Sequence, residues 1–94
     1  MKFTYYYEGN NLKKLSERNN SNNQSVDYYF DNNQLVFIYA YNKTKKTESR
    51  YYFDNNSMFR WLNGSKKEQI EKNSNTFKDK QEELLKRVSM LEEK

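Results

Sequence analysis

A pattern of aromatic and polar residues occurs three times along this chain. Each copy has three aromatic residues, an acidic residue, two residues drawn from Gly and Asn, one polar residue and one aliphatic residue. The copies cover residues 5–12, 28–35 and 51–58, so each begins 23 residues after the one before it. Aromatic residues favour β-strands, and Asn and Gly tolerate the positive φ of a two-residue hairpin turn. The pattern therefore predicts three β-hairpins in series, forming an antiparallel β-meander of about six strands.

The position of each hairpin turn predicts which residues face each other. If residues 32–33 form a turn, regular pairing places Phe30 opposite Leu35 and Tyr28 opposite Phe37. Alternation along the strands then puts a second set of large side chains on the other face: Tyr6, Tyr29, Val36, Ile38, Tyr52, Phe59 and Trp61. Both faces of the sheet are thus expected to be apolar, and each needs a cover. A shift of one residue in the pairing register of the strands exchanges the two faces.

The segment after the third hairpin has the periodicity of an amphipathic helix. Ser65 and Glu68 have the spacing of a capping box, which marks a helix start. Apolar residues then recur on one helical face, at Ile70, Phe77, Leu84, Val88 and Leu91. Polar residues 73–75 interrupt this stripe, and Thr76 and Asp79 can cap a second segment. One kinked helix and two helices both remain open.

These patterns predict a single α+β domain over residues 1–94, with the β-meander over 1–63 and the C-terminal helix over 65–93. The seven-residue spacing of the helical stripe allows a coiled-coil dimer, but polar residues at positions 74 and 81 favour a monomer whose helix packs on its own sheet. The segment 17–25 is mostly Asn and Ser and is predicted to be a mobile loop or a linker.

The composition excludes most catalytic chemistry. Hydrophobic residues are 34% of the chain and aromatic residues 17%, so the core is expected to consist largely of rings. Cys and His are absent, which removes disulfides, thiol nucleophiles, imidazole bases and the common zinc sites. Asp31 and Asp54 each precede a predicted turn, where Asp is a frequent structural residue. No enzymatic activity, cofactor or metal is expected.

The chain resembles a group of small uncharacterised Bacteroidetes proteins that are usually exported. The resemblance lies in the repeated Tyr-Tyr-Phe-Asp-Asn motif, the segment 60–62 and the trailing helix with Phe77. The motif is similar to tyrosine-aspartate and MORN-like hairpin repeats. The resemblance covers nearly the whole chain and implies a β-meander. It implies no activity.

Two sets of residues are candidates for binding. If the second sheet face is uncovered, its aromatic side chains form a patch of the kind that docks on a partner. The candidate partner-binding residues are Tyr6, Tyr29, Tyr52, Phe59, Trp61 and Arg50. Clustered cations beside aromatic residues are also a feature of single-stranded RNA sites. The candidate nucleic-acid-binding residues are Lys43, Lys45, Lys46, Arg60, Lys13 and Lys14.

These features favour a non-catalytic binding protein that docks on a macromolecular partner, either a protein or a ribonucleoprotein, with RNA contact as a further expectation. With a formal charge of +4, the chain does not have the acidic surface of a DNA mimic. The most concrete version is a phage or mobile-element inhibitor of a host nucleoprotein complex, of the anti-CRISPR type that blocks an RNA-guided nuclease. The chain as written has no signal or membrane-spanning segment, which favours the cytoplasm. The alternative is an exported or lipid-anchored bacterial envelope domain with a structural or ligand-binding role, whose signal has been removed.

Overall fold

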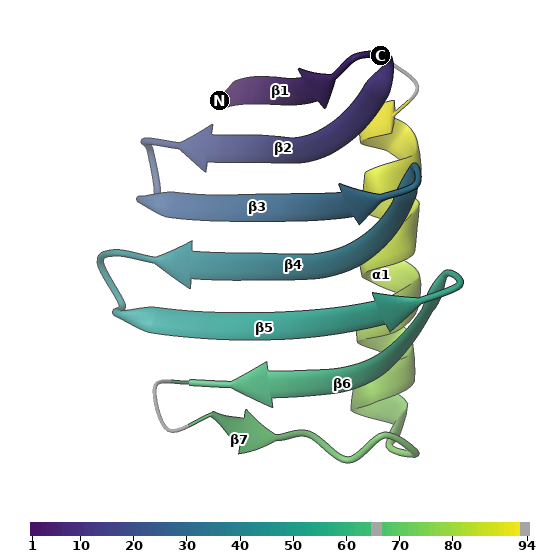
Figure 1. The fold of residues 1–94 in the computed structure, drawn as a ribbon. Helices are drawn as coiled ribbons and strands as arrows, with labels where there is room; N and C mark the ends of the chain where they lie inside the picture. The colour runs from purple at the N-terminus through teal and green to yellow at the C-terminus, as the bar shows by residue number, and fades with distance from the viewer. Residues whose placement is uncertain (65–66, 93–94) are drawn as a thin grey trace.

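The computed structural model of the chain describes residues 1–64 and 67–92. In this part of the chain, seven strands form one antiparallel sheet in which each strand pairs with the next, and one helix lies against one face (Figure 1). The elements are, in chain order, β1 (Lys2–Glu8), β2 (Asn11–Asn19), β3 (Gln24–Asp31), β4 (Gln34–Asn42), β5 (Thr47–Asp54), β6 (Ser57–Asn63), β7 (Glu68–Gln69) and α1 (Asn75–Glu92). The predicted α+β fold, a β-meander followed by a C-terminal helix, is confirmed.

The predicted two-residue turns are present, and in the second and third of them Asn supplies the positive φ. Asn32 and Asn33 have φ of 52° and 64°, and Asn55 and Asn56 have φ of 51° and 62°. Two consecutive residues with positive φ match the right-handed twist of the flanking strands. These turns lie at one end of the sheet, which we call the turn end (Figure 1). The four-residue connections 20–23 and 43–46 lie at the opposite end, which we call the loop end.

The predicted mobile loop over residues 17–25 is wrong. Its first residues belong to β2 and its last to β3, and only residues 20–23 form the connection. The Asn side chains stabilise this tight connection: Asn19 Oδ1 accepts a hydrogen bond from the Ser21 N–H, and Asn22 Oδ1 accepts one from the Gln24 N–H. The polar composition therefore reflects a strand end and a turn.

Each of the three hairpins that close through two-residue turns has a β-bulge. Tyr29 faces Phe37 whereas Phe30 faces Leu35, which leaves Val36 as an extra residue in β4. The corresponding extra residues in β2 and β6 are Lys13 and Phe59. Because these positions are 23 residues apart, the bulge is part of the repeat.

The bulges overturn the predicted faces of β4 and β6. Regular pairing placed Phe37 opposite Tyr28, but the residue opposite Tyr28 is Ile38. In the third hairpin, Trp61 likewise faces the buried Tyr51. The expectation that Ile38 and Trp61 lie on the second apolar face is wrong, because one extra residue reverses inside and outside along the rest of the strand.

The buried core lies between the sheet and α1, which crosses the strands near the turn end (Figure 1). As predicted, rings supply much of it. The buried apolar side chains are Leu15, Val26, Tyr28, Phe30, Leu35, Ile38, Tyr51, Phe53, Met58, Trp61, Phe77, Val88 and Leu91. Hydrogen bonds fasten the helix to the sheet. The Tyr5 hydroxyl donates to the Leu91 carbonyl at 3.1 Å, and the Met58 N–H donates to Gln81 Oε1 at 2.7 Å.

The helix begins later than the sequence pattern predicts. Glu68 belongs to β7 and α1 starts at Asn75, so the predicted start at the capping box is wrong; Ser65 itself lies outside the described residues. Ser74 is the N-cap, since its Oγ accepts the Phe77 N–H at 3.2 Å. Before it, the Ile70 N–H donates to the Trp61 carbonyl, so the segment is held along the edge of β6.

A polar network joins α1 to the sheet beside the core. The Tyr28 hydroxyl donates a 3.0 Å hydrogen bond to Glu17 Oε1, which also lies 3.3 Å from Arg87 Nη2 of α1. Burial raises the pKa of Tyr28 above its ordinary value, and the negative charge of Glu17 raises it further. The neutral hydroxyl is therefore the form that stabilises the fold.

We expect the free energy of unfolding to fall as the pH rises above about 10, the ordinary pKa of tyrosine in an unfolded chain. Because the pKa of Tyr28 is higher in the folded state, its contribution is complete below that pH and is lost as the pH approaches the folded value. Urea unfolding between about pH 8 and pH 11 measures this decline. The free energy of unfolding of Tyr28→Phe should decline less steeply with pH. An equal pH dependence in the variant and the wild type would show that Tyr28 does not cause the decline.

Candidate functional site

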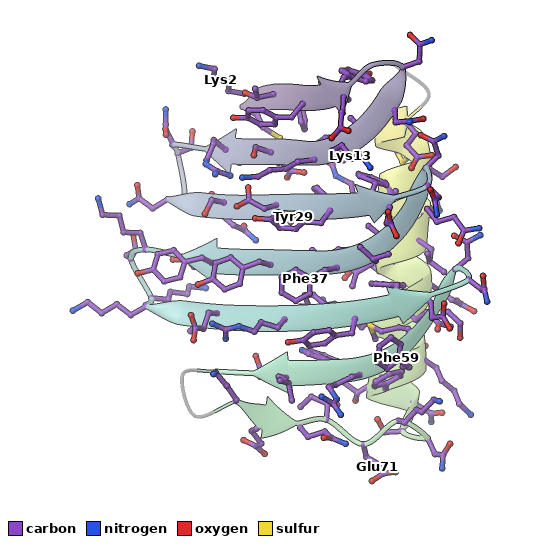
Figure 2. The ribbon with its side chains drawn as sticks, in the orientation of Figure 1. Lys2, Lys13, Tyr29, Phe37, Phe59 and Glu71 are labelled. Carbon is purple, nitrogen blue, oxygen red and sulfur yellow. The ribbon has the colours of Figure 1, made fainter. Side chains whose placement is uncertain are left out.

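The face of the sheet opposite α1, which we call the open face, has one continuous row of rings and cations. The pairing register aligns six residues across β1 to β6: Tyr6, Lys14, Tyr29, Phe37, Tyr52 and Arg60. We call this set the ring–cation row. Figure 2 views the sheet from this side and labels Tyr29 and Phe37 of the row, with Phe59 beside it on β6.

The members of the row contact one another. Ring centroids are 5.8 Å apart for Tyr29 and Phe37, and 4.9 Å apart for Phe37 and Tyr52. The Lys14 ammonium lies 5.4 Å from the Tyr6 ring centre and 5.3 Å from that of Tyr29, so this cation bridges two rings. At the other end, the Arg60 guanidinium lies 5.9 Å from the centre of Tyr52. These distances permit cation–π attraction and order the row.

Two carboxylates on the open face are each paired with an arginine and a hydroxyl group. Asp27 Oδ1 accepts hydrogen bonds from the Ser16 hydroxyl at 3.0 Å and from Arg18 Nη1 at 2.9 Å. The second cluster has the same design on β4 and β5: Glu48 accepts from the Tyr39 hydroxyl at 2.7 Å and from Arg50 Nη1 at 3.1 Å.

The second cluster also has an electrostatic consequence. The hydrogen bond from Tyr39, followed by the hydrogen bond and charge of Arg50, lowers the pKa of the Glu48 carboxyl below its usual range. The Arg50 guanidinium also lies 5.1 Å from the Tyr39 ring centre. Glu48 is therefore held as a paired carboxylate, an arrangement that does not favour proton transfer near neutral pH.

Charge differs between the two ends of the open face. Alternation along β1, β3 and β5 puts Glu8, Asp31 and Asp54 on this face at the turn end, where all three are exposed. At the loop end, the β4–β5 connection carries three exposed lysines, Lys43, Lys45 and Lys46. The ring–cation row lies between an acidic rim and a basic one.

The structure brings most of the predicted binding residues onto this one face. Those in or beside the ring–cation row are Tyr6, Lys13, Lys14, Tyr29, Tyr52, Phe59 and Arg60, with Arg50 two residues further towards the loop end. Lys43, Lys45 and Lys46 lie on the connection at the loop end, as expected. Trp61 does not belong to the site: it is 7% exposed, and its ring packs 5.4 Å from that of Tyr51 in the core.

Sequence reasoning missed three rings on β4. Phe37 was predicted to lie on the sheet face opposite that of Tyr29 and Tyr52, and Tyr39 and Tyr41 share its side of the strand. The repeat contained a signal for the side of the sheet on which Phe37 lies. Phe37 occupies the same position in the 23-residue repeat as Lys14 and Arg60. Charged residues at two copies of one position indicate that this position faces solvent.

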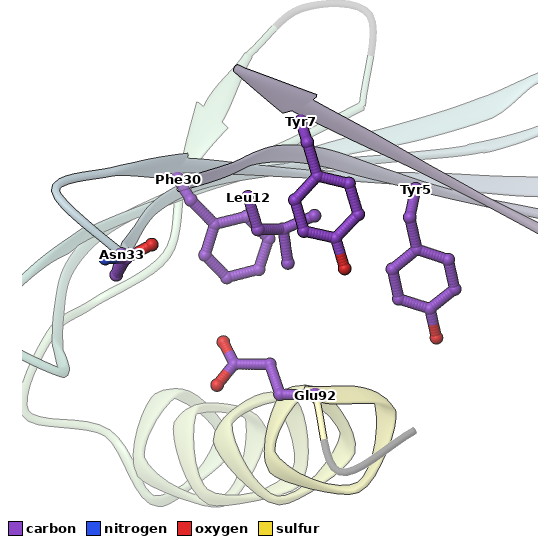
Figure 3. Close-up of a pocket in the computed structure, with 6 residues that line it drawn as sticks. All are labelled: Tyr5, Tyr7, Leu12, Phe30, Asn33 and Glu92. Atoms are coloured by element: carbon purple, nitrogen blue, oxygen red, sulfur yellow. The ribbon is translucent and has the colours of Figure 1, made fainter. Parts of the chain in front are cut away.

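A small pocket lies on the helix side of the sheet. It measures about 210 Å³ and is lined by Tyr5, Tyr7, Leu12, Phe30, Asn33 and Glu92. Figure 3 shows the Glu92 carboxylate directed from α1 towards the sheet residues, and burial raises its pKa. The ring–cation row is on the other side of the sheet, so this pocket is separate from the candidate site.

Comparison with known proteins finds no matching family model, no matching curated protein and no matching solved structure. The resemblance to exported Bacteroidetes proteins stays a prediction. Among the described residues, no helix is long and apolar enough to cross a membrane. The same residues contain no cluster of three acidic side chains suited to a metal ion.

Proposed function

We propose that this is a non-catalytic binding protein that docks on a macromolecular partner through the open face of its sheet. The observation that carries the proposal is the ring–cation row, which crosses six strands on the face that α1 does not cover. Aromatic residues and Arg are enriched at the centres of binding interfaces, where they contribute much of the affinity. Tyr6, at one end of the row, is 49% exposed, and Phe59, beside the other end, is 47% exposed, so both rings are accessible.

The polar groups near the row support binding more than catalysis. Asp27 and Glu48 are each held by an arginine and a hydroxyl group. Such pairs fix the orientation of the side chains. The arrangement favours a rigid surface whose aromatic rings keep their positions when a partner docks.

Within this class, we propose an inhibitor of a host nucleoprotein complex, such as an RNA-guided nuclease. A domain of 94 residues that offers one whole sheet face to a partner suits a role in blocking a larger assembly. The acidic rim is confined to the turn end, which leaves the rest of the open face compatible with an RNA-containing complex.

Affinity capture from the source organism tests this proposal. We expect a partner to be recovered with the wild-type chain and with a control, Lys78→Ala with Lys86→Ala, which changes only exposed residues of α1. Tyr29→Ala with Tyr52→Ala should reduce recovery by about 10-fold or more, since truncating an interface hot spot costs about 2 kcal/mol. Undiminished recovery with the folded double variant would show that docking uses another surface.

The identity of the captured complex tests the narrower role. Recovery of one nuclease complex supports the inhibitor, and ribonuclease treatment shows whether RNA is needed for the contact. Recovery of envelope components alone would favour the alternative, an envelope domain, and would exclude the inhibitor.

A further inference from the structure

We infer that the open face recognises a single-stranded nucleic acid, with bases over the ring–cation row and phosphates towards the loop end of the sheet. This inference rests on the proposed docking role of the open face, and it names the partner by the chemistry of the residues there. Three observations support it: the spacing of the rings, the distribution of charge and a polar recess at the loop end.

The rings form a platform of useful length. Neighbouring centroids between Tyr29 and Phe59 are 4.9 to 6.2 Å apart. Strands are about 4.8 Å apart, so a row that crosses six strands extends about 24 Å, enough for several unpaired bases. Stacking of bases on aromatic side chains tolerates any sequence, because every base has a π-face. A duplex hides these faces, which favours a single strand.

The cations within the row favour a nucleic acid over a protein. Lys is depleted at the centres of protein–protein interfaces. Here Lys14 lies between two rings, and Lys13 occupies the bulge next to it. Rings interleaved with ammonium and guanidinium groups are the combination that single-stranded nucleic acids require, since bases and phosphates alternate along the chain.

Charge orients the bound strand. Glu8, Asp31 and Asp54 at the turn end repel phosphates. At the loop end the lysines of the β4–β5 connection attract them, and the carboxylates nearest to it are already neutralised by arginines. Phosphates are therefore favoured on the loop side of the rings.

A recess at the loop end provides a place for the phosphate of a nucleotide that extends beyond the row, since Ser25 and Tyr41 lie four residues along their strands from Tyr29 and Phe37. It measures about 250 Å³ and lies between the connections 20–23 and 43–46. Two cations, Arg18 and Lys43, line it together with polar residues that can donate hydrogen bonds: Asn19, Asn20, Asn23, Gln24, Ser25 and Tyr41. Cationic groups combined with amide and hydroxyl donors are the usual ligands of phosphate oxygens in nucleic-acid complexes.

Fluorescence anisotropy with defined probes tests the inference. The probes are labelled oligouridylate and oligodeoxythymidylate of about 12 nucleotides, within known site sizes for sheet-based single-strand binders, and a duplex of equal length. Both single strands should bind more tightly than the duplex. Tyr29→Leu with Tyr52→Leu, which keeps apolar bulk but removes two rings, should weaken binding about 100-fold, roughly 10-fold per lost stacking contact.

Salt dependence tests the placement of the phosphates. Lys43→Ala with Lys45→Ala and Lys46→Ala should lower the slope of log affinity against log salt by up to about 2, because each lost contact to a single strand removes about 0.7. The matched control removes the same charge from α1: Lys78→Ala with Lys80→Ala and Lys86→Ala. The control should behave as the wild type.

The outcomes separate this inference from the proposed function. If neither oligonucleotide binds at low salt while capture still depends on Tyr29 and Tyr52, the partner is a protein; the inference is then wrong and the docking role stands. If the oligonucleotides bind equally well to the folded double-leucine variant, the contact is non-specific attraction, which overturns the inference. If the triple lysine variants of the loop and of α1 lower the salt-dependence slope equally, the inference is also wrong.

Discussion

Ile38→Ala is expected to lower the free energy of unfolding by about 2–5 kcal/mol, the usual loss for a fully buried Ile. Ile38 is 0% exposed and lies on β4, in the middle of the sheet, with Tyr28 and Tyr51 on the flanking strands. Truncation leaves a cavity that the surrounding rings cannot fill without moving. Chemical denaturation measures the effect, and Ile38→Val, at about 0.5–1.5 kcal/mol, provides a milder variant if the alanine variant does not fold.

The neighbouring positions on β4 provide the control. Val36 is the exposed bulge residue and Phe37 lies on the open face, so alanine at either position should cost less than at Ile38. The regular hairpin register predicts the reverse order for Phe37 and Ile38. A larger loss at Phe37 than at Ile38 would therefore contradict the bulged register and with it the composition of the ring–cation row.

Trp61→Ala is expected to lower the free energy of unfolding by about 3–5 kcal/mol, because the buried Trp61 ring packs against Tyr51 and its centre lies 5.9 Å from the Lys80 ammonium of α1. Trp61→Phe should change stability by less than about 1.5 kcal/mol. Among the described residues the buried Trp61 Nε1 has no hydrogen-bond partner, and an unsatisfied buried donor costs about 1–3 kcal/mol. In Trp61→Phe, removal of the unpaired N–H therefore offsets part of the packing energy that is lost with the smaller ring.

The same pair of variants distinguishes a core role from a binding role for Trp61. Since its side chain lies on the helix side of the sheet, Trp61→Phe should bind nucleic acid as the wild type does. Reduced binding by a variant of unchanged stability would place Trp61 in the site after all. Denaturation and anisotropy measured on the same samples provide both readings.

Much of the architecture could be predicted because it is local. The motif that repeats every 23 residues predicts the hairpins, and Asn32 with Asn33 predicts a turn whose backbone has positive φ. Such information is contained in a few consecutive residues and depends little on the rest of the chain. The helical stripe that includes Phe77, Val88 and Leu91 was predicted for the same reason, and all three side chains are buried.

The errors came from interactions between distant residues. The start of α1 was misplaced because strand pairing at β7 and the contact between Ile70 and Trp61 prevail over a local capping signal near Glu68. The segment 17–25 was assigned to a loop because its composition is polar, whereas its backbone is paired with neighbouring strands. Pairing partners of this kind are not visible in the composition of the segment itself.

The sequence predicted most residues of the candidate site but not how they are arranged. Lys14, Tyr29, Tyr52 and Arg60 were all named, but in two separate sets for two kinds of partner. The bulges bring them into one row and move Phe37 between Tyr29 and Tyr52. A β-bulge changes a single pairing step, and it leaves no signal in hydrophobic periodicity until the strands are aligned.

The amino-acid sequence by itself determined the repeating hairpins, their Asn turns, the ring-rich core and the amphipathic segment, because each depends on short-range backbone preferences and side-chain chemistry. Only the tertiary structure decided which residues face α1 and which lie on the open face. That choice depends on one extra residue in each hairpin and on where the helix packs, and both are properties of the assembled sheet.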